Sequence, residues 1–198
     1  MRVIAHSYIN PKGLHVNGEL LTGVTEEEQY LKQVYSSLSL DYPKFYKMDN
    51  LSKLAVLAVE GMLKVVAFPS EGSDLQLVFA NHSSSQQSDL KFIDSYTNLG
   101  NPSPSLFVYT LPNIVTGELS IRHKWYGENS FFIQPEFNPD LFIEQSSLAF
   151  LRGNNLCLCA WVEAQAQGNE ECFLFLVSRS EGSLESADIM DIYKSYTV

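Results

Sequence analysis

Cysteines are scarce, and their spacing matches neither a disulfide framework nor a metal site. Only three occur in 198 residues, an odd number without regular spacing. Cys157 and Cys159 alternate along one apolar run, and Cys172 lies in another. We therefore expect three free, buried thiols.

Basic residues are also in short supply. The 13 Lys and Arg are outnumbered by 23 Asp and Glu, which gives a formal net charge of −10. Because cations dominate binding to phosphate groups, this balance argues against nucleic acid and against an anionic membrane surface as partners. An acidic carrier protein would be repelled in general, unless the local patch Arg122-His123-Lys124 outweighs the net charge.

Long apolar runs are missing. No run approaches the roughly 18 residues of a membrane-spanning helix, and residues 1–13 lack the pattern of a signal peptide. We expect a cytoplasmic protein without membrane insertion. There is no Gly-rich phosphate loop or dinucleotide fingerprint, so we expect no cofactor. No metal-ligand spacing joins the four histidines, so we expect no metal. The histidines are His6, His15, His82 and His123.

What the sequence does contain is an alternation of apolar strands and helices. Hydrophobic residues make up 45% of the chain, enough for a sizeable core. The best helix spans residues 49–64, and 172–178 is predicted to pair with 156–162 as an antiparallel hairpin. No linker or repeat divides the chain. The predicted strands are residues 3–9, 75–79, 130–133, 156–162 and 172–178. We expect a single domain over 1–198, with a core at about 3–178 and a tail at 181–198 that carries a short surface helix.

The segment 130–140 has the plan of a catalytic turn. A short apolar strand leads into the sharp turn Gln134-Pro135-Glu136-Phe137, and Asn138-Pro139-Asp140 has the cap, first position and acidic first turn of a helix. Nucleophile elbows use such a bend to hold an activated Ser or Cys at the sheet edge. This turn holds neither residue.

A polar loop follows the strand at 75–79. Loops at the carboxyl ends of strands form the ligand sites of open α/β sheets, so His82 and Ser83 are candidates to line a ligand cleft. Phe132, Phe137 and Asn138, around the bend, are the other candidates. The alternatives are a solvated loop and, for the rings, ordinary core packing.

Several short motifs occur in a fixed order between residues 3 and 178. The turn Pro11-Lys12-Gly13 follows the first strand, and an Asp-led, Ala-rich helix and a strand with a small-residue loop come next. The most specific segment carries Leu111-Pro112-Asn113, Gly117, Leu119-Ser120-Ile121 and Gly127, followed by Arg152-Gly153 and a strand that ends at Glu163. Together these motifs resemble the N-terminal half of the β-ketoacyl synthases.

The resemblance implies an α/β, thiolase-like half-fold: a five-stranded mixed sheet with helices on both faces. The family's catalytic cysteine would fall at or beside Glu136, between Gln134 and Phe137, where neither a carboxylate nor a phenyl ring can form an acyl thioester. The family's two active-site histidines and its lysine belong to the second half-fold. The resemblance therefore implies a non-condensing partner or accessory subunit in bacterial fatty-acid or polyene/polyketide biosynthesis, rather than a condensing enzyme.

The resemblance also implies how such a subunit would pair. In the thiolase plan the strand before the nucleophile pairs across a two-fold axis, which predicts a homodimer, or a heterodimer with a ketosynthase-type subunit, and an acyl carrier protein is a further possible partner. The pairing strand here would consist of Ser130, Phe131, Phe132, Ile133 and Gln134. Two alternatives stay open: a malonyl-decarboxylase-like or other acyl-transfer enzyme that uses Glu136, and an acyl- or carrier-binding module.

Overall fold

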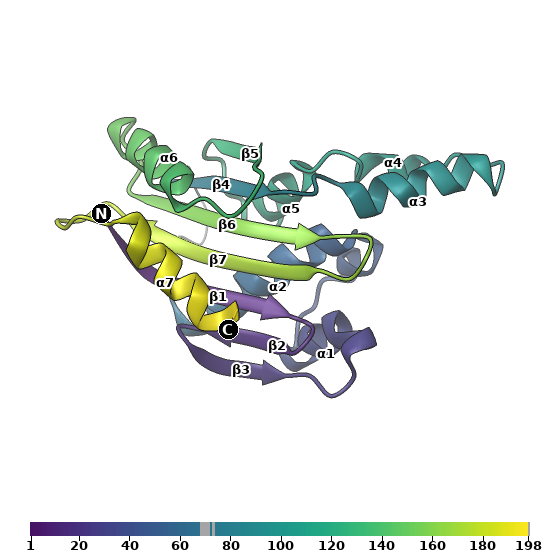
Figure 1. Cartoon of the computed structure of the whole chain (residues 1–198), viewed down its shortest axis with the longest axis horizontal. Coiled ribbons are helices and arrows are strands. Elements are labelled where there is room, and N and C mark those ends of the chain that lie inside the picture. Colours follow the sequence, from purple (N-terminus) through teal and green to yellow (C-terminus); the bar gives the residue numbers. More distant parts are fainter. Residues whose placement is uncertain (68–71, 73, 198) are drawn as a thin grey trace.

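A mixed β-sheet runs through the molecule in the order β3-β2-β1-β7-β6-β4-β5 (Figure 1). The computed structural model describes residues 1–67, 72 and 74–197. The strands are β1 (Arg2–Asn10), β2 (Gly13–Val16), β3 (Glu19–Gly23), β4 (Leu75–Asn81), β5 (Asn129–Ile133), β6 (Leu156–Ala164) and β7 (Glu170–Ser178). β4 pairs in parallel with β5 and β6, whereas β6 and β7 form the predicted antiparallel hairpin.

The predicted number of five strands is wrong, because the described residues form a sheet of seven strands. The two missed strands, β2 and β3, extend the sheet beyond β1 through a tight turn at Asn17 and Gly18. Both residues adopt positive φ angles, 50° and 86°, as a two-residue hairpin turn requires. The Asn-Gly pair is the strongest short-range signal for such a turn, and it was available in the sequence.

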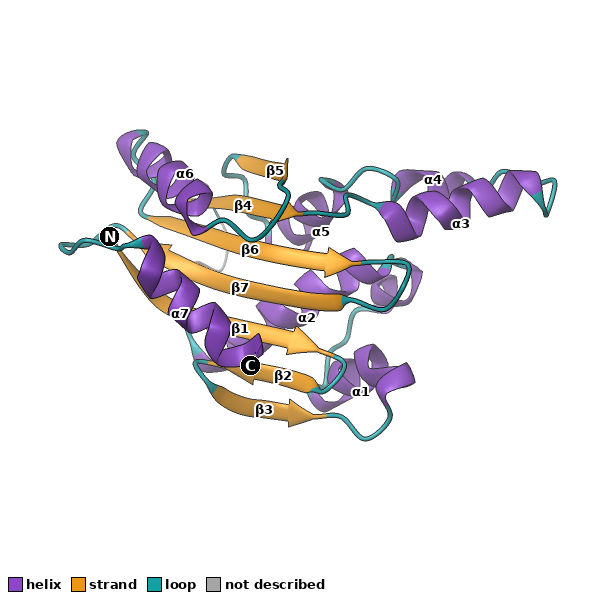
Figure 2. Cartoon of the chain, viewed as in Figure 1, coloured by secondary structure: helices purple, strands orange, loops and turns teal. Residues whose placement is uncertain are grey.

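Helices cover both faces of the sheet, as predicted, and two of them project beyond it (Figure 2). One face carries α1, α2 and α5, and the other carries α6 and α7. The helices are α1 (Tyr30–Ser37), α2 (Asn50–Val65), α3 (Gln86–Thr97), α4 (Pro104–Val108), α5 (Ile114–His123), α6 (Pro139–Leu151) and α7 (Ser186–Thr197), with 3-10 turns η1 (Glu27–Gln29) and η2 (Pro43–Lys47). α3 and α4 form an arm that extends away from the sheet (Figure 1).

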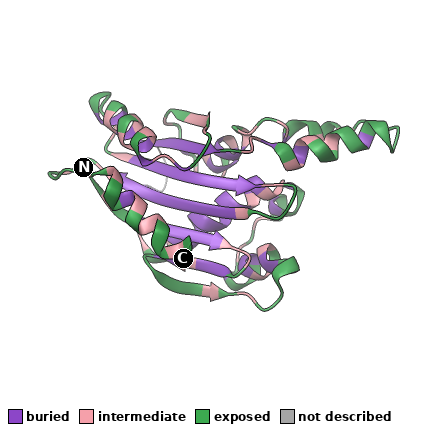
Figure 3. Ribbon diagram, in the orientation of Figure 1, coloured by how far each residue is buried: buried purple, intermediate pink, exposed green. Residues whose placement is uncertain are grey.

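α2 is the central helix of the larger core. Its first turn is capped by Asp49, whose carboxylate accepts the Ser52 N–H at 3.0 Å. Apolar residues lie on nearly every side of the helix and are buried against the sheet and α5 (Figure 3). At Gly61 a Cβ atom would lie 2.5 Å from the Leu14 side chain, so this glycine permits close contact with β2.

The C-terminal tail is an integral part of the second core. The short surface helix predicted for the tail is α7, which covers most of residues 181–198, and its Ile189 is fully buried. It packs with α6 over the face of β7 and β1, where Phe173 and Phe175 stack at 5.1 Å between ring centres. This helix thereby covers apolar sheet surface that would otherwise be exposed to water.

Candidate functional site

The bend after β5 has the strand–turn–helix geometry that the sequence predicts. The Gln134 N–H donates to the Asn81 carbonyl at 2.8 Å, which closes the end of β5 against the end of β4. Asn138 then caps α6, because its side-chain oxygen accepts the Asp140 N–H at 3.1 Å, and Pro139 occupies the first turn. The bend therefore stands at the carboxyl ends of the parallel strands β4, β5 and β6.

An open depression of about 450 Å³ lies beside this bend. Its walls come from the loop after β4, the bend itself, the ends of β6 and β7, and α7. The lining residues are His82, Pro135, Glu136, Phe137, Trp161, Glu163, Gln165, Asn169, Glu171, Met190 and Tyr193.

The candidate residues from the sequence divide between this depression and its surroundings. His82, Glu136 and Phe137 come together in its wall. Ser83 borders a neighbouring hollow beside α3, and Asn138 serves as the cap of α6. Phe132 is half-buried against the second core. Gln134 lies one residue beyond β5, so the pairing strand predicted at residues 130–134 begins and ends one residue later than β5.

Glu163 is the most deeply buried carboxylate of the depression, with 1% of its surface exposed. Its Oε1 accepts the backbone N–H groups of His82 and, at 3.3 Å, of Ser83. Its Oε2 is buried and has no hydrogen-bond partner within the described part of the chain. Glu163 thus fixes the loop after β4, a role that sequence reasoning missed. The sequence did contain a signal for it, because Glu163 is a charged residue near the end of an almost wholly apolar strand.

Glu171 joins three elements at the far side of the depression. Its carboxylate accepts the Tyr8 hydroxyl at 2.7 Å and the Tyr193 hydroxyl at 2.9 Å. Burial, together with the nearby Glu171 charge, raises the pKa of both phenols, which therefore stay protonated as donors. The Tyr193 ring also packs on Phe137 at 4.5 Å between centres. Through these contacts α7 becomes a wall of the site, which the sequence did not reveal.

The chemistry of the depression is acidic and contains no thiol. Three carboxylates line it, those of Glu136, Glu163 and Glu171, whereas the described lining residues include no Lys or Arg and a single histidine. The cysteines lie fully buried in β6 and β7, and burial raises the pKa of Cys159 and Cys172. The described lining residues therefore offer no thiol that could carry an acyl thioester.

Two further findings concern the described part of the chain. No group of three or more His, Cys, Asp and Glu side chains there could hold a metal ion. Likewise, none of its helices has both the length and the apolar character needed to cross a membrane.

No protein-family model matches this chain, and no curated protein sequence does. Comparison with solved structures gives clear matches. One is a ketosynthase (ApeO) in complex with its chain length factor (ApeC) from Xenorhabdus doucetiae, with a TM-score of 0.62 and 14% identity over 91% of this chain and 79% of that one. The fold is ketosynthase-like.

Two other matches place the chain in the same fold. The ishigamide ketosynthase/chain length factor gives a TM-score of 0.61 at 18% identity, over 91% of this chain and 62% of that one. A type II PKS acyl-carrier protein in complex with its ketosynthase (AntDE:AntF) gives a TM-score of 0.58 at 11% identity, over 96% of this chain and 59% of that one. This chain therefore spans less than two thirds of both of these ketosynthase-type chains, and the thiolase-like class predicted from the sequence is supported.

Proposed function

We propose that this chain is a single ketosynthase-like N-terminal domain that does not condense acyl groups and acts as a partner or accessory subunit in bacterial fatty-acid or polyketide-type biosynthesis. The observation that carries the proposal is Glu136 at the bend between β5 and α6, where this fold would present its nucleophile. A carboxylate at this position, beside the buried carboxylates Glu163 and Glu171, cannot form the acyl thioester that precedes condensation.

Two exposed surfaces support a role in assembly. β5 is the outermost strand of the sheet, so the backbone groups on its free side are available to another chain. The arm of α3 and α4 carries a set of exposed large apolar residues, which is typical of a protein-binding surface. These are Leu90, Ile93, Tyr96, Leu99, Phe107, Val108 and Leu111. We propose that a second copy, or a ketosynthase-type subunit, pairs along β5.

The hydrogen bonds of β5 suggest a sharp test of this pairing. The Gln134 N–H points inward to Asn81, so the Ile133 N–H, one residue earlier, points to the free side of the strand. Proline at position 133 removes that outward donor and leaves the inward bonds to β4 intact. Ile133→Ala is the matched control, because it shortens the same half-exposed side chain and keeps the N–H.

The experiment is size-exclusion chromatography with light scattering at tens of micromolar. We expect a mass of about twice 22.3 kDa for the wild type and for Ile133→Ala, and a monomer for Ile133→Pro. The same samples are mixed with a complete ketosynthase from the same host to detect a heterodimer. A wild-type chain that stays monomeric alone and does not co-elute with the ketosynthase would remove the proposed function.

A further inference from the structure

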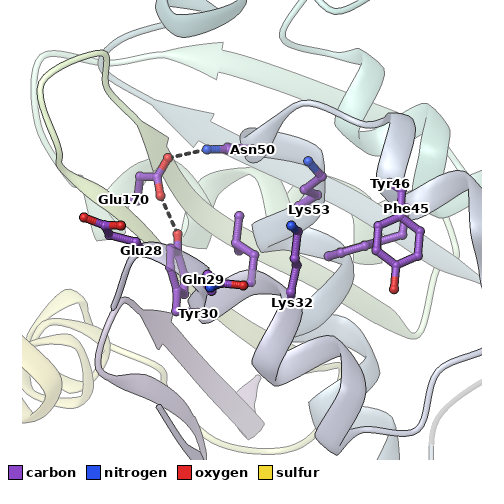
Figure 4. A pocket seen from close by; sticks show the side chains of 10 residues that line it. Glu28, Gln29, Tyr30, Lys32, Phe45, Tyr46, Asn50, Lys53 and Glu170 are labelled. Carbon is purple, nitrogen blue, oxygen red and sulfur yellow. Dashed lines mark hydrogen bonds between the residues drawn. The ribbon is translucent and has the colours of Figure 1, made fainter. Parts of the chain in front are cut away.

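A second hollow of about 220 Å³ lies on the opposite face of the sheet (Figure 4). It is enclosed by the start of α1, by η2, by the start of α2 and by the first residue of β7. Phe45 and Tyr46 form one side, whereas Asn50 and Glu170 form the other (Figure 4). None of its lining residues borders the depression at Glu136.

Two lysine side chains end in this hollow. Figure 4 shows the ammonium groups of Lys32 and Lys53 between the aromatic side and the Glu170 side. Among the described residues, neither ammonium forms an ion pair with a carboxylate. Lys53 is half-buried, and its Nζ lies 5.9 Å from the centre of the Phe45 ring. The hollow therefore holds two cations without a direct counter-ion.

The pKa of Lys53 is lowered by its surroundings. Burial is the main cause of its lowered pKa, and repulsion by Lys91 and Lys32 adds to it, while Asp49 and Glu170 oppose the shift. Lys32 and Lys53 line the hollow together, in a chain with a net charge of −10. An anion bound between them would relieve both the repulsion and the loss of hydration.

The acidic groups nearby are already engaged by neutral donors. Glu170 accepts the Tyr30 hydroxyl at 2.7 Å on one oxygen, and on the other the side-chain amides of Asn50 at 2.6 Å and Gln87 at 3.2 Å. Asp49 is occupied by the Ser52 N–H of its cap and by the Ser88 hydroxyl. The remaining acid, Glu28, is an exposed lining residue that forms no ion pair with another described residue.

We propose that this hollow binds a small phosphate monoester. Two ammonium groups match the charge of a phosphate dianion, and lysines act as point charges suited to phosphate. The rings of Phe45 and Tyr46 offer contact area to the organic group that carries the phosphate. The site is independent of the proposed subunit role.

The test is a titration of the full chain, in low salt, with phenyl phosphate and with inorganic phosphate, followed by NMR and calorimetry. We expect saturable one-site binding, tighter for phenyl phosphate, with the largest amide shifts in α1 and at the start of α2. Lys53→Gln and Lys32→Gln should each weaken binding about tenfold or more. Lys194→Gln, an exposed change on α7, is the matched control and should leave the affinity unchanged.

A second measurement guards against an effect of the variants on folding. Phenyl phosphate should raise the melting temperature of the wild type and of Lys194→Gln, and this rise should vanish in Lys53→Gln, whose melting temperature without ligand stays close to that of the wild type. Absence of saturable binding at millimolar concentrations would overturn the proposal. Equal affinity of Lys53→Gln and wild type would overturn it as well.

Discussion

Glu170 and Glu171 are neighbours at the start of β7, and their carboxylates are held on opposite faces of the sheet. Glu170 accepts the hydroxyl of Tyr30 at the start of α1, whereas Glu171 accepts the hydroxyls of Tyr8 and of Tyr193 in α7. The alternation of side chains along a strand produces this division. One short piece of strand therefore helps to fix two helices and to shape both hollows.

The hydrogen bond from Tyr193 to Glu171 should contribute measurably to stability. Tyr193→Phe removes a half-buried donor to a charged acceptor, so we expect the free energy of unfolding in urea to fall by about 1–2 kcal/mol. Tyr126→Phe is the control, because Tyr126 is 70% exposed and its change should cost less than about 0.5 kcal/mol. Equal effects of the two variants would mean that Glu171 does not anchor α7.

The buried carboxylate of Glu163 should hold the loop after β4 through its acceptor oxygen. Glu163→Ala leaves the N–H groups of His82 and Ser83 without their acceptor, and we expect a loss of about 2–3 kcal/mol in unfolding free energy. Glu163→Gln retains a side-chain oxygen in the same place and should cost less than half as much. Thermal and urea unfolding of both variants tests this role. If Glu163→Ala does not cost more unfolding free energy than Glu163→Gln, the role as an acceptor is contradicted.

The three thiols should be inert in the native protein. Cys157, Cys159 and Cys172 are each 0% exposed, and burial raises the pKa of Cys159 and Cys172. We expect less than one thiol per chain to react with Ellman's reagent at pH 8 in an hour, and all three to react in denaturant. A rapidly reacting native thiol would argue that a nucleophile is accessible.

Stability should fall as the pH is lowered from 7.5 to 5.5. Burial lowers the pKa of His6, His15 and His123 below 6.5 in the folded chain, so the unfolded state binds protons first in this window and is favoured by acid. His123→Gln should flatten the pH profile of the unfolding free energy. Burial raises the pKa of Asp49, so protonation of Asp49 stabilises the folded state, but only nearer pH 4. A rise in stability as the pH is lowered from 7.5 to 5.5 would therefore contradict the assignment to the histidines.

The sequence predicted those elements whose signals are local. The long helix predicted at residues 49–64, the strand–turn–helix around Asn138 and the β6–β7 hairpin are all confirmed, because side-chain caps and apolar runs act over a few residues. β2 and β3 were missed because β3 is largely exposed and lacks an apolar run. Only the Asn17–Gly18 turn marked this hairpin.

Sequence reasoning named some of the residues that line the depression and missed the others. Strand ends and the bend brought His82, Glu136 and Phe137 to one wall, as sheet topology requires. The contributions of Glu171 and Tyr193 depend on where α7 packs, which is a tertiary contact between segments with no local signature. The proximity of Lys32 and Lys53 in the second hollow could not be predicted either, because α1 and α2 bring them together only in the folded chain.

The most direct measurement of whether this chain has acyl chemistry is intact-mass spectrometry after incubation with malonyl-CoA and with a malonyl carrier protein. The small-molecule products are analysed in parallel. Because we propose that Glu136 stands where the family presents its nucleophile, and because acidic side chains line the depression beside it, we expect an unchanged protein mass and no acetyl product above the background without protein. An acyl adduct on the chain, or acetyl product whose formation is abolished by Glu136→Ala, would contradict the non-condensing role and identify an enzyme that uses this carboxylate.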